Sequence, residues 1–209
     1  MHMIKLPEEG KLFEWRAFGS LPSSLVGQIR SFPVRHGLSH LTEHDIYFIS
    51  EANDQNVKLR KTNALWVLKF KLLLETGPDS IELYQESVNQ VYQLPAGNQQ
   101  VEEAARLLDI TLPPDFETNG ARLDRDALVR VFSRSSPPTR IVGVPKVRSQ
   151  FLIEGGWVEL ADVVFPNRET QSISIQAYER SVVKRLLSQL KVGADLAVLN
   201  YVQACRIWG

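Results

Sequence analysis

Alternating apolar and polar positions cover most of the first two thirds of the chain. Apolar side chains at every second position are typical of a half-buried strand, and Gly77 and Pro78 mark one of the turns between such runs. The predicted strands are residues 12–19, 45–50, 57–61, 65–74 and 80–88. Closely spaced strands with short turns predict an antiparallel meander.

The apolar pattern takes a helical period in the middle of the chain. Residues 98–108 and 123–133 carry apolar side chains three and four positions apart. Strand patterns return at residues 140–144, 146–153, 157–164 and 171–177, and residues 179–192 predict one more amphipathic helix. Because no stretch reads as a linker, we expect a single domain over residues 1–209, with 193–209 as a C-terminal helical extension.

Basic residues recur at every second position within several predicted strands. The pairs are Lys58 and Arg60, Lys69 and Lys71, and Lys146 and Arg148. Since residues i and i+2 of a strand share a face, each pair places two cations side by side. Arg16 adds a cation on a fourth strand, with Glu14 beside it. A strand with one solvated face gives the same pattern, but four such strands favour an inward basic face that an anionic ligand neutralises.

The overall composition makes these cations a local feature. Lys plus Arg and Asp plus Glu both number 24, and this balance excludes a protein that coats nucleic acid through bulk charge. Cys205, the only cysteine, lies in an apolar stretch and is expected to be a buried, inert thiol. The first ten residues lack an apolar signal core, and no run approaches the ~20 apolar residues of a membrane span, so we expect a cytoplasmic protein.

Five short motifs follow one another along the chain. They are Asp45-Ile46-Tyr47-Phe48, Lys58-Leu59-Arg60, Leu68-Lys69, Lys146-Val147-Arg148 and Ala161-Asp162-Val163. Their order resembles that of the CYTH superfamily, also called the triphosphate tunnel metalloenzymes, over roughly residues 12–190.

This resemblance, together with the strand pattern, predicts an α+β fold. We expect a largely antiparallel β-barrel, or tunnel, of about eight strands, closed around a polar, basic lumen with helices packed outside. Within that lumen the resemblance implies a set of residues that contact the anionic oxygens of a ligand. The set comprises Arg16, Lys58, Arg60, Lys69, Lys71, Lys146 and Arg148.

The carboxylates that the family uses to hold metal ions are mostly missing. Leu12 replaces the first glutamate of the opening Glu-x-Glu-x-Lys motif, and residues 172–176 carry no carboxylate where the family has a glutamate pair. Mg²⁺ and Mn²⁺ need hard oxygen ligands, so we expect weak metal binding without an anionic ligand. Glu14, Glu82 and Glu86 are the remaining candidate ligands, although solvated carboxylates are the commoner case for the last two.

Three functions remain open. The first is binding of a small phosphorylated or otherwise polyanionic molecule in the basic lumen, with little metal-dependent hydrolysis. The second is an enzyme, a metal-dependent triphosphate or polyphosphate hydrolase. The third is a non-catalytic interaction or assembly module, whose apolar segment 194–208 docks a partner or a second copy of the chain, as in a homo-oligomer.

Overall fold

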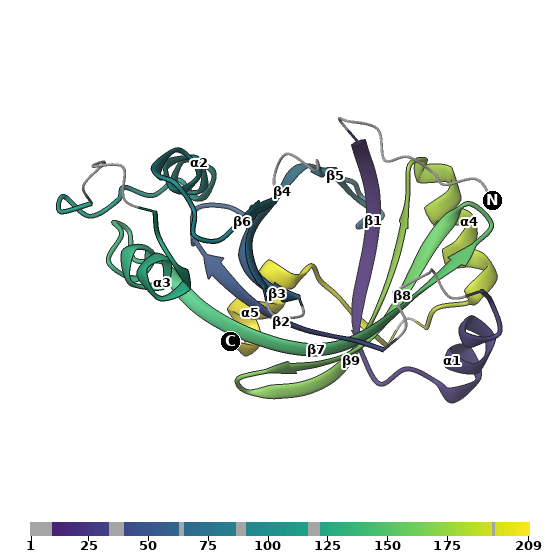
Figure 1. Cartoon of the computed structure of the whole chain (residues 1–209). Coiled ribbons are helices and arrows are strands. Elements are labelled where there is room, and N and C mark those ends of the chain that lie inside the picture. The colour runs from purple at the N-terminus through teal and green to yellow at the C-terminus, as the bar shows by residue number, and fades with distance from the viewer. Residues whose placement is uncertain (1–9, 34–39, 63–64, 87–90, 117–121, 194) are drawn as a thin grey trace.

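Eight strands of the chain form a closed antiparallel barrel, as the sequence predicts (Figure 1). The computed structural model describes residues 10–33, 40–62, 65–86, 91–116, 122–193 and 195–209. The barrel strands are β1 (Gly10–Gly19), β2 (Leu41–Ile49), β3 (Asn56–Thr62), β4 (Leu65–Thr76), β5 (Glu82–Glu86), β7 (Arg140–Ile153), β8 (Gly156–Phe165) and β9 (Arg168–Ala177). Around the barrel they follow the order β1, β5, β4, β3, β2, β7, β8, β9, and pairing of β9 with β1 closes the ring.

Two short strands and five helices complete the described part of the chain. Strand β6 (Val91–Gln93) pairs with β4, and β10 (Ala197–Val198) pairs with β1. The helices are α1 (Ser23–Arg30), α2 (Asn98–Leu108), α3 (Arg125–Ser133), α4 (Arg180–Leu190) and α5 (Tyr201–Trp208). The expected extension over residues 193–209 is therefore helical only from Tyr201 onward. Among these helices, none has the length and apolar character needed to span a membrane.

Strand β7 runs without a break where the sequence pattern predicts two strands. The two predicted strands, 140–144 and 146–153, are separated by Pro145, and proline lacks the N–H that a central strand donates. In the structure, β7 pairs with β8 only from Lys146 onward, whereas residues 140–148 pair with β2. The exposed Pro145 thus lies where β7 has one neighbour instead of two, a position at which a strand tolerates proline.

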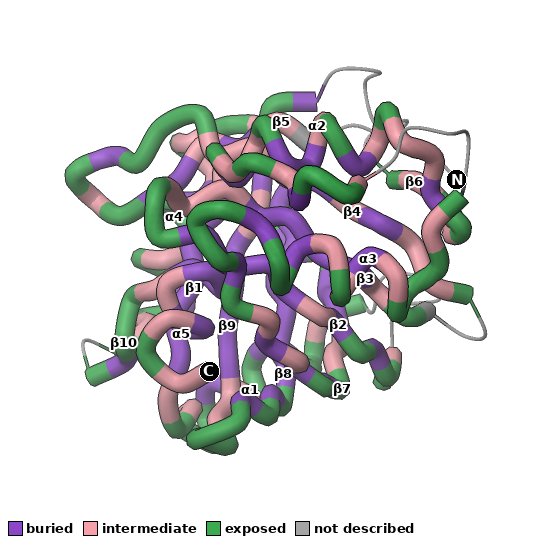
Figure 2. The backbone as a smooth tube through the Cα atoms, turned by 90° about the vertical axis from the view of Figure 1, so that its left-hand side faces the viewer, coloured by how far each residue is buried: buried purple, intermediate pink, exposed green. Residues whose placement is uncertain are grey.

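Helices cover two opposite sides of the barrel. On one side, α1 and α4 pack on β1, β8 and β9 through residues such as Ile29 and Leu186 (Figure 1). On the other side, α2 and α3 pack on β2, β3 and β4, with Phe48 and Phe132 stacked at 4.5 Å between ring centroids. Buried residues are accordingly concentrated in the barrel strands, while many residues of the turns are exposed (Figure 2). These two cores use the outward faces of the strands, so the inward faces line the interior of the barrel.

Apolar side chains fill one end of the barrel interior, and α5 closes that end. Phe18, Ile49 and Phe165 from the strands form one cluster with Tyr201 and Cys205 of α5. In Figure 1, α5 lies behind the opening that the strands surround. Cys205 is fully buried, as the sequence predicts, and its burial raises the pKa of the thiol to about 12. The segment offered as a docking helix thus packs Val202 and Cys205 against its own barrel, while Val198 and Ile207 stay exposed.

Candidate functional site

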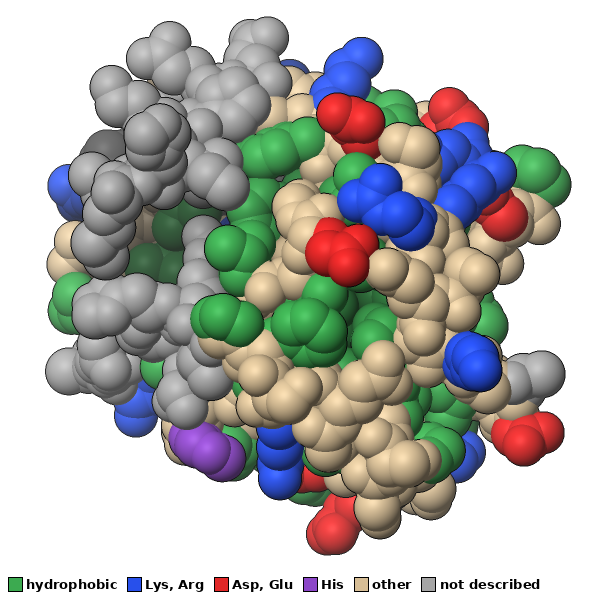
Figure 3. All heavy atoms as spheres, turned by 90° about the vertical axis from the view of Figure 1, so that its right-hand side faces the viewer, with side chains coloured by type: hydrophobic (Ala, Val, Ile, Leu, Met, Phe, Trp, Pro, Cys, Tyr) green, Lys and Arg blue, Asp and Glu red, His purple; other side chains and the backbone are tan. Residues whose placement is uncertain are grey.

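A layer of charged side chains lies next to the apolar cluster inside the barrel. Strand alternation brings the basic pairs to the inward face, and register places them beside carboxylates: Arg60 pairs with Asp45 across β2 and β3, and Lys146 pairs with Glu43 across β2 and β7. Outside the barrel, the described acidic and basic side chains intermingle on the face of α1 and α4 (Figure 3). We call the inward-facing set, defined by its ion pairs below, the charged layer.

Asp45 and Glu43 of β2 form the centre of the charged layer. Asp45, which is fully buried, accepts hydrogen bonds from Nε and Nη2 of Arg60 at 2.7 and 2.8 Å and from Nζ of Lys146 at 2.8 Å. Nζ of Lys58 lies 3.3 Å from the same carboxylate. Burial opposes ionisation of Asp45, but these three cations hold its pKa well below the usual range.

Glu43 bridges the same cations to Arg148. It accepts a hydrogen bond from Nη2 of Arg148 at 2.9 Å and lies 3.3 Å from Nη1 of Arg60 and 3.5 Å from Nζ of Lys146. Burial opposes its ionisation, yet these three cations lower the pKa of Glu43. Four basic residues from two strands therefore share two carboxylates on β2.

Arg16 of β1 has all five of its N–H groups bonded to the protein. Its Nε donates to Glu14 at 3.0 Å, and both terminal nitrogens donate to Glu159 at 3.2 Å. The remaining two bonds go to the hydroxyls of Ser172 and Ser174 at 3.1 and 3.0 Å. The closing strand thus presents hydroxyl acceptors where the family would carry its glutamates, and Glu159 supplies a carboxylate from the neighbouring strand.

Glu159 and Glu14 extend the network around the barrel. The second oxygen of Glu159 accepts a hydrogen bond from Nη1 of Arg148 at 2.9 Å, which joins Arg16 to the cations around Asp45. The second oxygen of Glu14 contacts Nζ of Lys71 and accepts a bond from Gln176 at 2.9 Å. Burial opposes ionisation of both glutamates, but their cations lower both pKa values.

The charged layer keeps an excess of positive charge. It contains six cations, Arg16, Lys58, Arg60, Lys71, Lys146 and Arg148, and four carboxylates, Glu14, Glu43, Asp45 and Glu159. Each carboxylate contacts at least two of the cations, and six positive charges against four negative ones leave a formal excess of two. Lys69 and Glu82 face inward as well, opposite Lys58 and Glu14, and add one formal charge of each sign. The protein itself supplies most of the neutralisation that the sequence interpretation had assigned to a ligand. Burial also lowers the pKa of Lys58 well below its usual range.

Lys69 and Glu86, two further predicted site residues, lie on β4 and β5. Lys69 is half-buried and pairs with Lys58 across β3 and β4, and its charge contributes to lowering the pKa of Lys58. The structure thus brings all seven predicted basic residues to one inward face. Glu86 belongs to β5 through its backbone, but its side chain lies outside the described residues.

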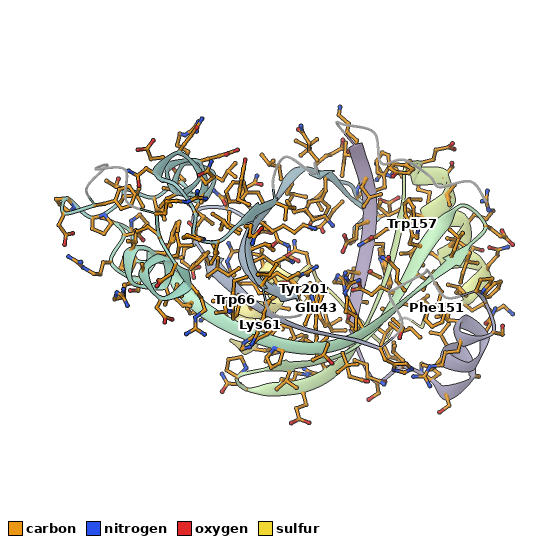
Figure 4. The ribbon with its side chains drawn as sticks, viewed as in Figure 1. Glu43, Lys61, Trp66, Phe151, Trp157 and Tyr201 are labelled. Atoms are coloured by element: carbon orange, nitrogen blue, oxygen red, sulfur yellow. The ribbon has the colours of Figure 1, made fainter. Side chains whose placement is uncertain are left out.

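The ring of Tyr201 packs against the charged layer. Its centroid lies 4.5 Å from Cζ of Arg16 and 4.7 Å from Nζ of Lys146, and the ring stacks on that of Tyr47 with 5.5 Å between the centroids. Figure 4 shows Tyr201 and Glu43 close together near the middle of the barrel, and Lys146 contacts both. Cations over an aromatic face are stabilised by its quadrupole, so Tyr201 supports the layer without adding charge.

Three buried polar atoms of the charged layer lack a hydrogen-bond partner in the described part of the chain. They are Oε2 of Glu43, Nε of Arg148 and the hydroxyl of Tyr201. Native proteins pair most buried polar atoms, so unpaired ones call for an explanation such as a ligand or ordered water.

The carboxylates that we describe do not fit a metal ion. Both oxygens of Glu14 contact cations, and those of Glu82 accept hydrogen bonds from Asn200 and Tyr84, each at 2.7 Å. Burial raises the pKa of Glu82, which leaves it a poorer ligand for a cation. Across the described residues, no group of three or more His, Cys, Asp and Glu side chains could hold a metal ion.

The sequence interpretation found only Glu14 among the four carboxylates of this site, and it placed Glu14 beside Arg16 as a candidate metal ligand. Asp45 entered only as part of a family motif, and Glu43, Glu159 and Tyr201 were not selected. The sequence did contain a pattern that points to Glu43 and Asp45, because these two residues are two positions apart and share one strand face, as the basic pairs do. Nothing comparable marked Tyr201, which reaches the layer from α5.

The chain is a closed antiparallel barrel with basic side chains that point into its interior. This is the triphosphate tunnel fold, which the order of the sequence motifs predicts. Solved structures with this fold include a candidate adenylyl cyclase from Hippeastrum, HpAC1, named for a dominant triphosphatase activity. It is 16% identical, with a TM-score of 0.54, and the match covers 94% of this chain and 95% of that one.

Two prokaryotic structures are similar to the same degree. A conserved hypothetical protein from Pyrococcus furiosus is 14% identical, with a TM-score of 0.55 and coverage of 91% and 98%. A candidate adenylate cyclase from Bacillus halodurans is 13% identical, with a TM-score of 0.53 and coverage of 96% and 100%. No family model and no curated protein matches the sequence. At such low identity, the likeness shows the fold alone.

Proposed function

We propose that the chain binds a small phosphorylated anion in the charged layer, without metal-dependent hydrolysis. The observation that carries this proposal is the convergence of six cations from β1, β3, β4 and β7, four buried and two partly buried, on one interior layer that keeps an excess of positive charge. Buried cations in excess are costly unless an anion pairs with them, so an anionic ligand would stabilise the folded state.

Arg60 and Arg148 are the residues best suited to meet such a ligand. Their side chains are 15% and 11% exposed, compared with 2% for Lys146 and 5% for Arg16. A guanidinium presents parallel N–H donors that match two oxygens of a phosphate. The triphosphatase activity named for the Hippeastrum neighbour supports phosphate chemistry in this fold.

The same contacts make the two alternative functions less suitable. Metal-dependent hydrolysis needs carboxylates that are free to bind a cation, and those of the charged layer already contact lysine or arginine. An assembly module built on the C-terminal segment needs a continuous apolar face. Tyr201, Val202 and Cys205 of α5 pack against its own barrel, so that Ile207 is the large aliphatic side chain this helix leaves exposed among the described residues.

A thermal-shift and calorimetry experiment tests the proposal. We expect tripolyphosphate, orthophosphate or both to raise the Tm of the protein in EDTA, beyond the effect of sodium chloride at matched ionic strength. Arg60→Glu should abolish the gain, because it places a carboxylate next to Asp45 and Glu43. Arg134→Glu is the matched control, since Arg134 is an exposed arginine at the C-terminal end of α3 that pairs only with Asp115 among the described carboxylates.

Circular dichroism identifies a variant that fails to fold. If Arg60→Glu is unfolded, Arg148→Gln replaces it, because it removes one cation without adding a carboxylate. The absence of any stabilisation of the wild-type protein by either phosphate compound would refute the proposed function.

A further inference from the structure

We propose that the charged layer accommodates a single phosphate group, best matched by hydrogen phosphate, and that it discriminates against both triphosphates and sulfate. This inference rests on the proposed function and specifies its ligand. It follows from two independent observations, the charge balance of the layer and the chemistry of its unpaired buried atoms.

The charge balance limits how much negative charge the layer can accept. Six cations face four carboxylates, and each carboxylate already contacts two or three cations. A phosphate group carries about two negative charges at neutral pH, which equals the formal excess when Lys58 is protonated, the state that an anion beside Lys58 favours. The further charges of a triphosphate would face Glu43, Asp45 and Glu159 without counter-ions of their own, and the described residues offer no metal site to compensate them.

The N–H donors of Arg16 are not available to bind a triphosphate. All five of its N–H groups already bond to Glu14, Glu159 and two serine hydroxyls. A triphosphate that used Arg16 would have to displace a buried carboxylate, which would then lose its counter-ion. The donors that remain lie elsewhere in the layer.

The unpaired atoms include both a donor and an acceptor. Nε of Arg148 can only donate, and Oε2 of Glu43 can only accept while that carboxylate is ionised. The hydroxyl of Tyr201 can do either. Glu43 is 1% exposed, and Oε2 contacts Lys146 only at 3.5 Å, so water does not readily satisfy it.

Hydrogen phosphate has the matching chemistry. Its unprotonated oxygens accept hydrogen bonds, and its O–H can donate to the carboxylate oxygen of Glu43. Sulfate has nearly the same shape and charge, but it is fully ionised and has no donor. Placing sulfate in the layer would therefore leave Oε2 of Glu43 facing a second anionic oxygen, whereas hydrogen phosphate would pair with it.

Calorimetry in EDTA with orthophosphate, sulfate and tripolyphosphate tests this inference. At matched ionic strength we expect orthophosphate to bind roughly tenfold more tightly, or better, than either competitor. Tripolyphosphate binding most tightly would overturn the single-phosphate inference while leaving the proposed function intact. Sulfate binding as tightly as orthophosphate would overturn it in the same way, whereas no binding by any of the three would refute the proposed function itself.

Two glutamine variants distinguish the effect of the unpaired oxygen of Glu43 from the effect of removing one negative charge. Glu43→Gln and Glu159→Gln each remove one negative charge, but only Glu43 carries an unpaired oxygen, because both oxygens of Glu159 accept bonds from arginine. Both variants should therefore bind tripolyphosphate better, while the preference for phosphate over sulfate should fall toward unity only in Glu43→Gln.

The phosphate-to-sulfate ratio is measured within each variant, so partial unfolding affects both ligands equally and cancels. Equal loss of the preference in both variants, or its retention in Glu43→Gln, would overturn the assignment of Glu43 as the acceptor. A stable preference in Glu159→Gln together with its loss in Glu43→Gln supports it.

Discussion

Replacing Asp45 with asparagine should destabilise the protein and at the same time strengthen anion binding. Asp45 is fully buried and contacts three cations, Arg60, Lys146 and Lys58, at 2.7 to 3.3 Å. The Asp45→Asn change keeps the side-chain volume but removes the charge. The three cations then lose a shared partner in a buried environment.

The size of the loss can be worked from these contacts. Breaking a buried ion pair by removing one partner costs about 3–5 kcal/mol. Lys58 can release its proton and relieve part of this cost, since burial already lowers its pKa, so we expect about 3–4 kcal/mol. For a domain of this size each kcal/mol shifts Tm by roughly 2–4 °C, and the midpoint should fall by about 6–16 °C.

Thermal melts followed by circular dichroism measure this shift, with Asp115→Asn as the matched control. Asp115 also pairs with an arginine, Arg134, at 2.8 Å, but both side chains are 61% exposed, so the control should melt almost as the wild type does. Orthophosphate should then stabilise Asp45→Asn more than the wild type, because the excess charge is larger. If Asp45→Asn melts like the control, or gains no more from phosphate than the wild type, the account of the charged layer is wrong.

Further predictions concern pH, helix capping and the thiol. Stability should decline as pH falls below about 5, since the pKa values of Asp45 and Glu159 are lowered on folding and the unfolded chain takes up protons first; a flat profile of urea midpoints would contradict this. Glu82→Gln should raise Tm at pH 7 but not at pH 4, because its raised pKa penalises only the ionised form. Asn200→Ser should destabilise less than Asn200→Ala, since serine still caps α5, and urea melts compare the two. Cys205 should resist iodoacetamide at pH 8 until urea unfolds the chain, and rapid labelling of the native protein would contradict its burial.

Local sequence patterns predicted the barrel strands but not the two short strands that pair with them. Both middle helices and all eight barrel strands follow from apolar spacing, with β7 divided in two at Pro145. Strands β6 and β10 have three and two residues, too few to show a period. Pro145 is tolerated because β8 begins to pair with β7 only after it, a fact that depends on tertiary register.

The site was predictable for its basic residues and for Glu14, but not for its other carboxylates. Lys58, Arg60 and the other pairs follow from strand alternation alone, which is a local property of the chain. Their carboxylate partners depend on which strands become neighbours and in what register, and closure of the barrel decides both. Tyr201 enters from a helix whose position depends on packing against the barrel end.

The pairing of β1 with β9 also has a consequence for how the protein folds. Phe13 pairs with Ala177, and Arg16 finds Glu159, Ser172 and Ser174 only when these distant segments meet. Contacts so remote in sequence form slowly, because the entropy of closing a long loop opposes them until many interactions are gained together. Arg16 therefore completes its bonds in the same step that closes the barrel, and a partly folded chain has no finished site to offer a ligand.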